Sequence, residues 1–125
     1  MKFCPLASET EDRDSLASEF RTAREIGRVC MGELHLFLRV GLKTYYIPYR
    51  DVRRCFRRVQ LIPAKMCCGR GDLEVENLVV CGDAGELIQV QLPGTKAAKI
   101  LMEELRERIP EAEFGKPGAK EPQGE

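Results

Sequence analysis

Polar and apolar residues alternate in the stretch ELHLFLRV, residues 33–40. The apolar phase of this alternation contains Leu34, Leu36, Leu38 and Val40, and the other phase contains Glu33, His35, Phe37 and Arg39. A period of two residues is typical of a half-buried β-strand, so we expect the second phase to face water. The flanking runs 28–31 and 43–48 are rich in β-branched or aromatic residues. This pattern predicts three successive strands joined by tight turns, with Pro48 ending the third.

The next stretch, residues 51–62, fits two secondary structures. A helical spacing of i, i+3, i+4 and i+7 is met by Val52, Cys55, Phe56 and Val59. A strand spacing is met by Cys55, Arg57, Val59 and Leu61. Because the neighbouring segments are predicted strands, we predict a short turn at 50–53 followed by a strand.

Residues 73–92 predict a β-hairpin with one irregular strand. The apolar phase changes between the pair Leu73 and Val75 and the pair Leu78 and Val80. A β-bulge or a break near Glu76 and Asn77 would account for this change. The sequence LVVC-GDAG-ELIQVQL then has the form of two strands joined by a four-residue loop. The positions expected to face the core on the last strand are Ile88, Val90 and Leu92.

After the turn at 93–94 the apolar period changes to that of a helix. One apolar stripe contains Ala98, Leu101, Met102, Leu105 and Ile109. Such a stripe predicts an amphipathic helix of about 15 residues that buries one side. We expect Thr95 to cap its N-terminus and Pro110 to end it. Glu104 and Arg108 are spaced to form a favourable i, i+4 ion pair.

Length and composition indicate one small domain with less regular ends. The chain has 125 residues, of which 43% are hydrophobic and 32% charged, as is typical of a single globular domain. We expect residues 1–22 to form a loose N-terminal arm or a short helix, 23–112 to form the domain, and 113–125 to be disordered. No run approaches the roughly 20 apolar residues that span a bilayer, and no secretion-signal core is present, so we expect a cytoplasmic protein.

The order of many strands followed by one amphipathic C-terminal helix resembles that of pleckstrin-homology-like (PH-like) domains. Residues 46–59, YIPYRDVRRCFRRV, are similar to a segment of bacterial PH-like domains in which a strand ends in I-P-Y and an aliphatic residue follows the turn. Residues 85–110 are similar to the last hairpin, strand and closing helix of that family. The resemblance implies a mostly β fold of the α+β class, in which about seven antiparallel strands form two near-orthogonal sheets, an open barrel closed by the helix.

Two departures limit what the resemblance implies about function. The chain has no tryptophan, a residue that eukaryotic PH domains carry in the closing helix. Its first two loops offer only Arg28 and Lys43 in place of the basic cluster that binds phosphoinositides. Specificity for a lipid headgroup is therefore not carried over, and the fold alone does not fix a function.

Basic side chains are concentrated in the middle of a chain whose net charge is zero. Residues 26–68 carry nine basic and two acidic groups, whereas residues 69–125 carry seven basic and twelve acidic groups. The candidate ligand-binding residues are Arg50, Arg53, Arg54, Arg57 and Arg58, together with Lys43. Guanidinium groups suit phosphates and carboxylates, and the aromatic residues of segment 45–60 could stack on bases.

The alternative for these arginines is structural. A solvated strand would pair them with acidic groups of the last third of the chain, such as Glu74, Glu76, Glu86 or the helix glutamates. Strand alternation also divides them between two faces, one with Arg54, Phe56 and Arg58 and the other with Arg53, Cys55, Arg57 and Val59. On a strand, the five arginines therefore cannot form one surface.

The cysteines and the single histidine carry weaker chemical signals. Cys67, Cys68 and Cys81 form the only thiol cluster, but zinc sites use four ligands at ordered spacings, and no such spacing is present. Reduced, buried thiols are the commoner state of cysteine in a chain without an export signal. His35 lies in the polar phase of a strand, where a solvent-facing or hydrogen-bonded histidine is more common than a Cys-His nucleophile. We therefore predict no metal, no cofactor and no catalytic site.

Three hypotheses for function follow from these residues. The first is a non-enzymatic binding or scaffolding module that recognises a protein or peptide, or an anionic ligand held by the arginines. The second is nucleic-acid binding through segment 45–60. The third is a thiol or metal protein that uses Cys67, Cys68 and Cys81. An exposed edge strand would also allow two copies to pair, so a homodimer is left open.

Overall fold

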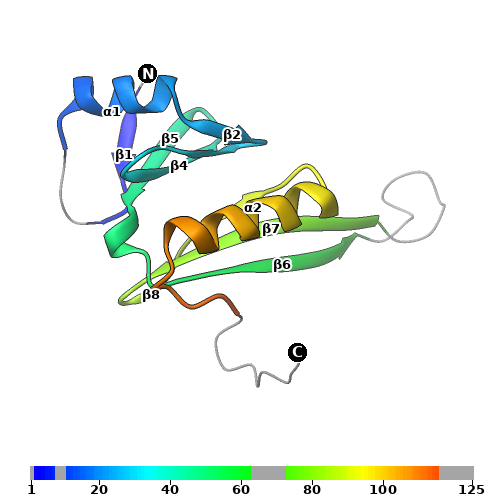
Figure 1. Cartoon of the computed structure of the whole chain (residues 1–125). Helices are drawn as coiled ribbons and strands as arrows, with labels where there is room; N and C mark the ends of the chain where they lie inside the picture. Colours follow the sequence, from blue (N-terminus) through cyan, green and yellow to red (C-terminus); the bar gives the residue numbers. More distant parts are fainter. Residues whose placement is uncertain (1, 8–10, 63–72, 116–125) are drawn as a thin grey trace.

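The protein folds into two β-sheets and two helices (Figure 1). The computed structural model describes residues 2–7, 11–62 and 73–115. Along the chain the elements are β1 (Phe3–Pro5), α1 (Arg13–Arg21), β2 (Arg24–Ile26), β3 (Val29–Met31), β4 (His35–Val40), β5 (Lys43–Pro48), a 3₁₀ turn (Tyr49–Asp51), β6 (Arg54–Ile62), β7 (Leu73–Gly82), β8 (Gly85–Gln91) and α2 (Thr95–Arg108).

The first sheet has the strand order β1-β5-β4-β3-β2. Its pairings are antiparallel except that β1 runs parallel to β5. The three successive strands predicted between residues 28 and 48 are confirmed as β3, β4 and β5. Gly27 and Gly41 adopt φ values of 61° and 64° in the two tight turns, a conformation that glycine adopts without steric cost.

Both faces of β4 are buried, so the prediction that its second phase faces water is wrong. Leu36 and Leu38 point into the main core, and Phe37 on the opposite face is also fully buried. Helix α1 covers that face: Leu16 packs with Phe37 in a second cluster of buried residues. The period of two identified the strand correctly, but it does not reveal a helix that covers the other side.

His35, on the same face as Phe37, is 6% exposed and lies between two carboxylates. Its Nδ1 is 2.8 Å from Oε1 of Glu19, whose other oxygen accepts the backbone N–H groups of Leu34 and His35. Its Nε2 is 2.9 Å from Oε2 of Glu11, at ion-pair distance but without hydrogen-bond alignment. These contacts fix α1 to the first sheet, so the histidine is a buried, paired group and is not solvent-facing.

The second sheet is antiparallel, with the order β6-β7-β8. The predicted turn at 50–53 followed by a strand is confirmed by the 3₁₀ turn and β6. The irregularity expected near Glu76 and Asn77 is instead between Val80 and Cys81. Glu76 belongs to the apolar phase of β7, because an ion pair allows it to be buried beside Leu78. The hairpin to β8 is also tighter than predicted, since Gly82 and Gly85 pair directly.

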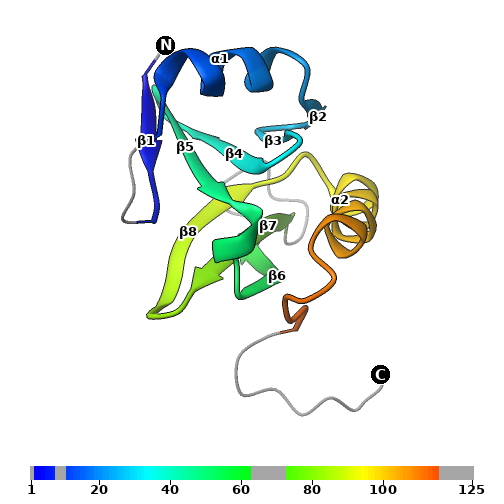
Figure 2. The same ribbon diagram turned by 60° about the vertical axis from the view of Figure 1, so that its left-hand side comes forward.

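Helix α2 packs against the second sheet and closes the main core (Figure 2). All five residues of the predicted stripe are buried, namely Ala98, Leu101, Met102, Leu105 and Ile109. The Glu104–Arg108 pair is confirmed at 3.3 Å. The predicted cap is wrong: Gly94 occupies the N-cap position, and the Thr95 hydroxyl instead donates to Glu76 at 2.9 Å.

Contacts far apart in sequence join the two halves of the molecule. Arg24 of β2 forms a bidentate ion pair with Glu104 of α2, the shortest N–O distance being 2.8 Å. A Cβ atom at Gly27 would come within 2.7 Å of Pro93 in the connection to α2. The first sheet therefore packs closely against the start and the middle of the closing helix.

The mostly β, α+β fold class is confirmed by these elements. The described residues contain eight strands, and no hydrogen-bonded ladder among them joins the two sheets into a closed barrel. Residues 1–22, predicted as a loose arm or a short helix, contain β1 and α1. Of the predicted tail 113–125, residues 113–115 run beside β6, and residues 116–125 lie outside the described part of the chain. Neither described helix has the length and apolar character needed to cross a membrane.

Candidate functional site

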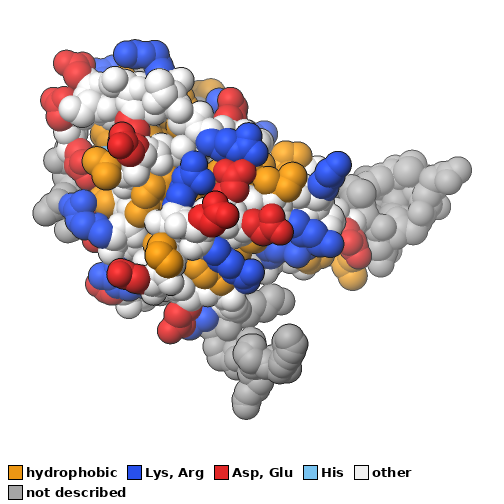
Figure 3. All heavy atoms as spheres, in the orientation of Figure 1, with side chains coloured by type: hydrophobic (Ala, Val, Ile, Leu, Met, Phe, Trp, Pro, Cys, Tyr) orange, Lys and Arg blue, Asp and Glu red, His pale blue; other side chains and the backbone are white. Residues whose placement is uncertain are grey.

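The five candidate arginines occupy the turn before β6 and both faces of the strand. Arg57 pairs across the ladder with Leu78, a core residue, so its side chain lies on the face toward α2. Arg54 and Arg58 lie with Phe56 on the outer face, as strand alternation predicted. Lys43 lies on β5 of the first sheet and is not brought together with the arginines. In the view of Figure 3, basic and acidic side chains are intermixed over the visible face of the molecule.

Arg57, which is half-buried, forms an ion pair with the buried Glu76 at the N-terminus of α2. Its Nε and Nη2 donate to the two carboxylate oxygens of Glu76 at 3.0 and 2.7 Å, and Glu76 is only 3% exposed. Thr95 donates a further hydrogen bond to the same carboxylate. The hydrogen bond from Arg57 is the main cause that lowers the pKa of Glu76. This group joins β6, β7 and α2, which makes Arg57 a structural residue.

The outer-face arginines are paired with carboxylates as well. Arg58 donates to Glu86 at 3.1 Å and to Gln89 at 2.6 Å, and its guanidinium lies 5.5 Å from the centre of the Phe56 ring. Arg54 binds Glu113. Arg53 precedes β6 and binds Asp83 at 2.7 Å, on the same surface as Arg54 and Arg58, so the prediction that it shares a face with Arg57 is wrong. Figure 1 shows the β7–β8 turn and the segment after α2 at the same end of the sheet.

A surface depression of about 430 Å³ lies over these outer-face pairs. It is lined by three arginines and four carboxylates, the charged residues being Arg53, Arg54, Arg58, Asp83, Glu86, Glu111 and Glu113. A free anion would meet more negative than positive charge there. The arrangement agrees with the structural alternative for the arginines, with Glu76 and Glu86 as two of the expected partners.

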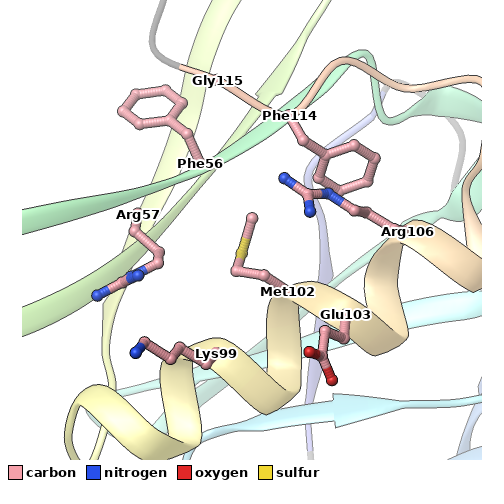
Figure 4. A pocket seen from close by; sticks show the side chains of 8 residues that line it. All are labelled: Phe56, Arg57, Lys99, Met102, Glu103, Arg106, Phe114 and Gly115. Carbon is pink, nitrogen blue, oxygen red and sulfur yellow. The ribbon is translucent and has the colours of Figure 1, made fainter. Parts of the chain in front are cut away.

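A second depression, of about 360 Å³, is a groove between β6 and α2 (Figure 4). Met102 rises from α2 into this groove, with Arg57 on one side and Phe114 on the other. Arg106 lies over the Phe114 ring, 5.4 Å from its centre, and Lys99 and Glu103 complete the helix side. The groove therefore has an apolar floor and a charged rim.

Among residues 2–7, 11–62 and 73–115, few contact the backbone at the edge of β6 beside this groove. At one end, Cys55 N–H donates to Glu113 C=O at 2.9 Å, and Glu113 N–H donates to Arg53 C=O at 3.0 Å. Backbone groups alternate in direction along a strand, so those of Arg57, Val59 and Leu61 point to the same side as those of Cys55. Among the described residues, no hydrogen bond reaches these three N–H and C=O groups.

Two apolar side chains continue the open edge beyond the groove. Val59 is 44% exposed and Leu61 is 61% exposed, and both share the α2-facing side of β6 with Arg57. The other edge strand of this sheet, β8, contacts β4 of the first sheet (Figure 2). The free side of β6 is therefore the candidate functional site.

Sequence reasoning placed the arginines but did not find this site. Lys99, Arg106 and Phe114 carry no local signal, because they meet β6 only through the packing of α2 and the return of the chain after it. The feature that could have indicated the site is the pair Val59 and Leu61. These residues are apolar although the strand that contains them is otherwise rich in arginine.

The cysteines that the structure describes show no arrangement for metal binding. Cys81 is 6% exposed, and burial raises its pKa; burial also raises the pKa of Cys55 to about 12. Cys67 and Cys68 lie outside the described residues, and the described ranges contain no group of three or more ligands that could hold a metal ion. Protonated, buried thiols are unreactive.

Compared with known proteins, the chain matches no family model, no curated protein and no solved structure.

Proposed function

We propose that this chain is a non-enzymatic binding module of PH-like fold that takes up an extended protein segment as an additional strand on the free side of β6. The observation that carries the proposal is the row of outward-pointing backbone groups at Arg57, Val59 and Leu61, which lies directly beside the groove. In strand addition, main-chain hydrogen bonds provide affinity, and pockets for alternate side chains provide specificity. The site offers both.

The groove favours a peptide with one apolar side chain. Met102 and Phe114 would bury such a side chain, and complete burial stabilises by about 1.5–3 kcal/mol. Lys99 and Arg106 outnumber Glu103 on the rim, so an acidic residue next to the apolar one would be attracted. Each backbone hydrogen bond adds about 0.5–1.5 kcal/mol net. Ordering the peptide opposes these gains, so we expect micromolar affinity.

The PH-like fold remains an inference from the resemblance and from the order of elements. A run of antiparallel strands in two sheets, followed by one helix that packs into the core, is compatible with it. The β1–β5 pairing is parallel and is not part of the expected pattern.

Binding of an anionic ligand or a nucleic acid has less support. Both hypotheses need unpaired arginines on one surface, whereas Arg54, Arg57 and Arg58 bind carboxylates and lie on two faces. Tyr45 and Tyr46, the aromatic residues at the start of segment 45–60, belong to the other sheet. The thiol hypothesis has no support from the described cysteines.

A peptide selection with a matched pair of variants tests the proposal. Short random linear peptides displayed on phage are selected against the folded chain, and the enriched peptides are titrated by calorimetry. Val59→Pro removes one outward N–H, whereas Val59→Thr keeps it. We expect both variants to fold, because Val59 is exposed at the edge of the sheet. We expect about tenfold weaker peptide binding only for Val59→Pro, since one backbone hydrogen bond is lost and the proline ring keeps the peptide backbone away from β6.

Chemical-shift mapping gives an independent readout. Bound peptides should shift the amide resonances of Arg57, Val59 and Leu61, and the resonances of α2 beside the groove. Selected peptides that bind Val59→Pro as well as the native chain, and that shift amides elsewhere, would refute strand addition at β6.

A further inference from the structure

We infer that the free side of β6 pairs with β6 of a second copy of this chain, in an antiparallel dimer whose two-fold axis passes beside Val59. This inference rests on the proposed function, because it requires that the edge accept an additional strand. The bound strand would then come from a second copy of the chain, and the partner's Leu61 would lie at the groove.

Within the described part of the chain, the edge formed by residues 57–61 lacks the devices that normally prevent such pairing. Native sheets protect their edges with short strands, prolines, bulges or charged side chains directed at the edge. β6 has nine residues, and the described charges on it are directed elsewhere, since Arg57 and Arg58 are held by Glu76 and Glu86. Val59 and Leu61 expose apolar surface at this edge. A long edge strand with exposed apolar side chains and no described neighbour is a site of association.

The geometry of β6 selects one register for the pair. A two-fold pairing centred on Val59 joins Val59 to its own copy and joins Arg57 to the partner's Leu61. The three outward-pointing residues of each copy then exchange six backbone hydrogen bonds. All the residues in this register are described and none has another backbone partner on that side.

The neighbouring registers are less favourable. A centre at Arg57 would require the N–H of Cys55, which Glu113 already accepts. A centre at Arg58 would place like charges directly opposite each other. Centres at Gln60 or Leu61 would bring residue 63, a proline without an N–H, into the ladder.

Side chains in the Val59-centred register are complementary. On the face toward α2, the partner's Leu61 would lie opposite Arg57, at the mouth of the groove formed with Met102 and Phe114. Val59 would meet the partner's Val59 across the axis. On the outer face, Arg58 would lie opposite the partner's Gln60. No like charges oppose each other, and both grooves are filled by the same interaction.

The contact would be small, so the association should be weak and concentration-dependent. Interfaces that bury less than about 1,200 Å² in total are usually transient. We expect a dissociation constant in the micromolar range or above. A peptide that binds the same edge should therefore compete with self-association.

Sedimentation equilibrium of the full chain under reducing conditions tests the inference. The variants are Val59→Lys and Leu61→Lys, and the control is Leu42→Lys, because Leu42 is fully exposed in the β4–β5 turn of the other sheet. We expect a monomer–dimer equilibrium for the native chain and for Leu42→Lys. Val59→Lys should raise the dissociation constant of the dimer at least tenfold, since two ammonium groups would meet at the axis. Leu61→Lys should also raise it, because the new ammonium group would lie opposite the partner's Arg57.

Hydrogen exchange supplies a test that needs no variant. Amide exchange at Arg57, Val59 and Leu61 should slow as the concentration of the native chain rises. A chain that remains monomeric, or variants that associate like the native chain, would overturn self-association. The peptide titration distinguishes a failure of self-association from a failure of strand addition. If the chain stays monomeric but selected peptides still shift the β6 amides, the proposed function stands.

Discussion

The two sheets of this protein differ in how completely the chain covers them. The first sheet has the main core on one face and α1 on the other, and β1 pairs along the outer edge of β5. In the second sheet, α2 covers one face, and no described residue forms a hydrogen bond with most of one edge of β6. In the first sheet, β4 is paired on both sides, and β5 is paired with β4 and, over Thr44–Tyr46, with β1. In the second sheet, the described residues leave the outward backbone groups of β6 beyond Cys55 without a partner. We therefore expect substitutions in the first region to change mainly stability and, under the proposed function, substitutions at the edge of the second to change mainly binding.

The largest expected effect is on the covered sheet. Phe37→Ala removes a fully buried ring that packs against Leu16 and Phe20, and such a cavity costs about 3–5 kcal/mol. Urea unfolding followed by circular dichroism measures it. Leu42→Ala, at a fully exposed position of the same sheet, should change the free energy of unfolding by less than about 0.5 kcal/mol. A similar small change for Phe37→Ala would show that α1 does not seal this face.

An intermediate effect is expected at the junction of the second sheet with α2. Glu76→Gln keeps the shape of the side chain but removes the charge that Arg57 pairs with, so we expect a loss of about 1–3 kcal/mol at pH 7. Folding lowers the pKa of Glu76 from its ordinary value of 4.5. The stability that the ionised carboxylate contributes is therefore fully present above pH 4.5, and it is lost as the pH falls through the lower, folded-state pKa. The difference between native and variant proteins should therefore shrink in acid.

Unfolding curves at pH 7 and at successively lower pH values measure this difference. Glu74→Gln is the matched control, because Glu74 is an exposed carboxylate on the same strand. A constant difference across the whole acid range would contradict the role assigned to the Arg57–Glu76 pair.

The smallest expected effect is on the stability of the open edge. Val59→Lys should change the free energy of unfolding of the monomer by no more than about 0.5 kcal/mol, because the side chain is already 44% exposed. The measurement is made at a protein concentration well below the dissociation constant of self-association. A loss as large as that of Phe37→Ala would mean that Val59 belongs to the core and not to a binding surface.

The repeating patterns of the sequence predicted much of the fold. Alternation located β4 and β6, and the stripe from Ala98 to Ile109 located α2, because each element buries one regular face. The errors came from contacts between elements. Glu76 suggested a break in β7, yet a distant arginine and threonine allow it to be buried.

The candidate site was less predictable than the fold. The division of Arg54, Arg57 and Arg58 between two faces of β6 followed from alternation, and the structure agrees with it. Arg53 departs from it, because it precedes the strand. The groove did not follow from any local pattern, because it depends on Phe114 returning to β6 from far along the chain. The backbone hydrogen bonds that join Glu113 to Arg53 and Cys55 likewise result from that return.

The position of α2 as the last described helix has a consequence for biosynthesis. Its buried stripe completes the core that both sheets share, and its Glu104 binds Arg24, a residue made 80 positions earlier. A ribosome adds about 5–20 residues per second, so the strands emerge several seconds before the helix that shields them. During that interval the core between the two sheets lacks the residues that α2 contributes, so we expect the nascent chain to complete its core only when residues 95–109 have emerged.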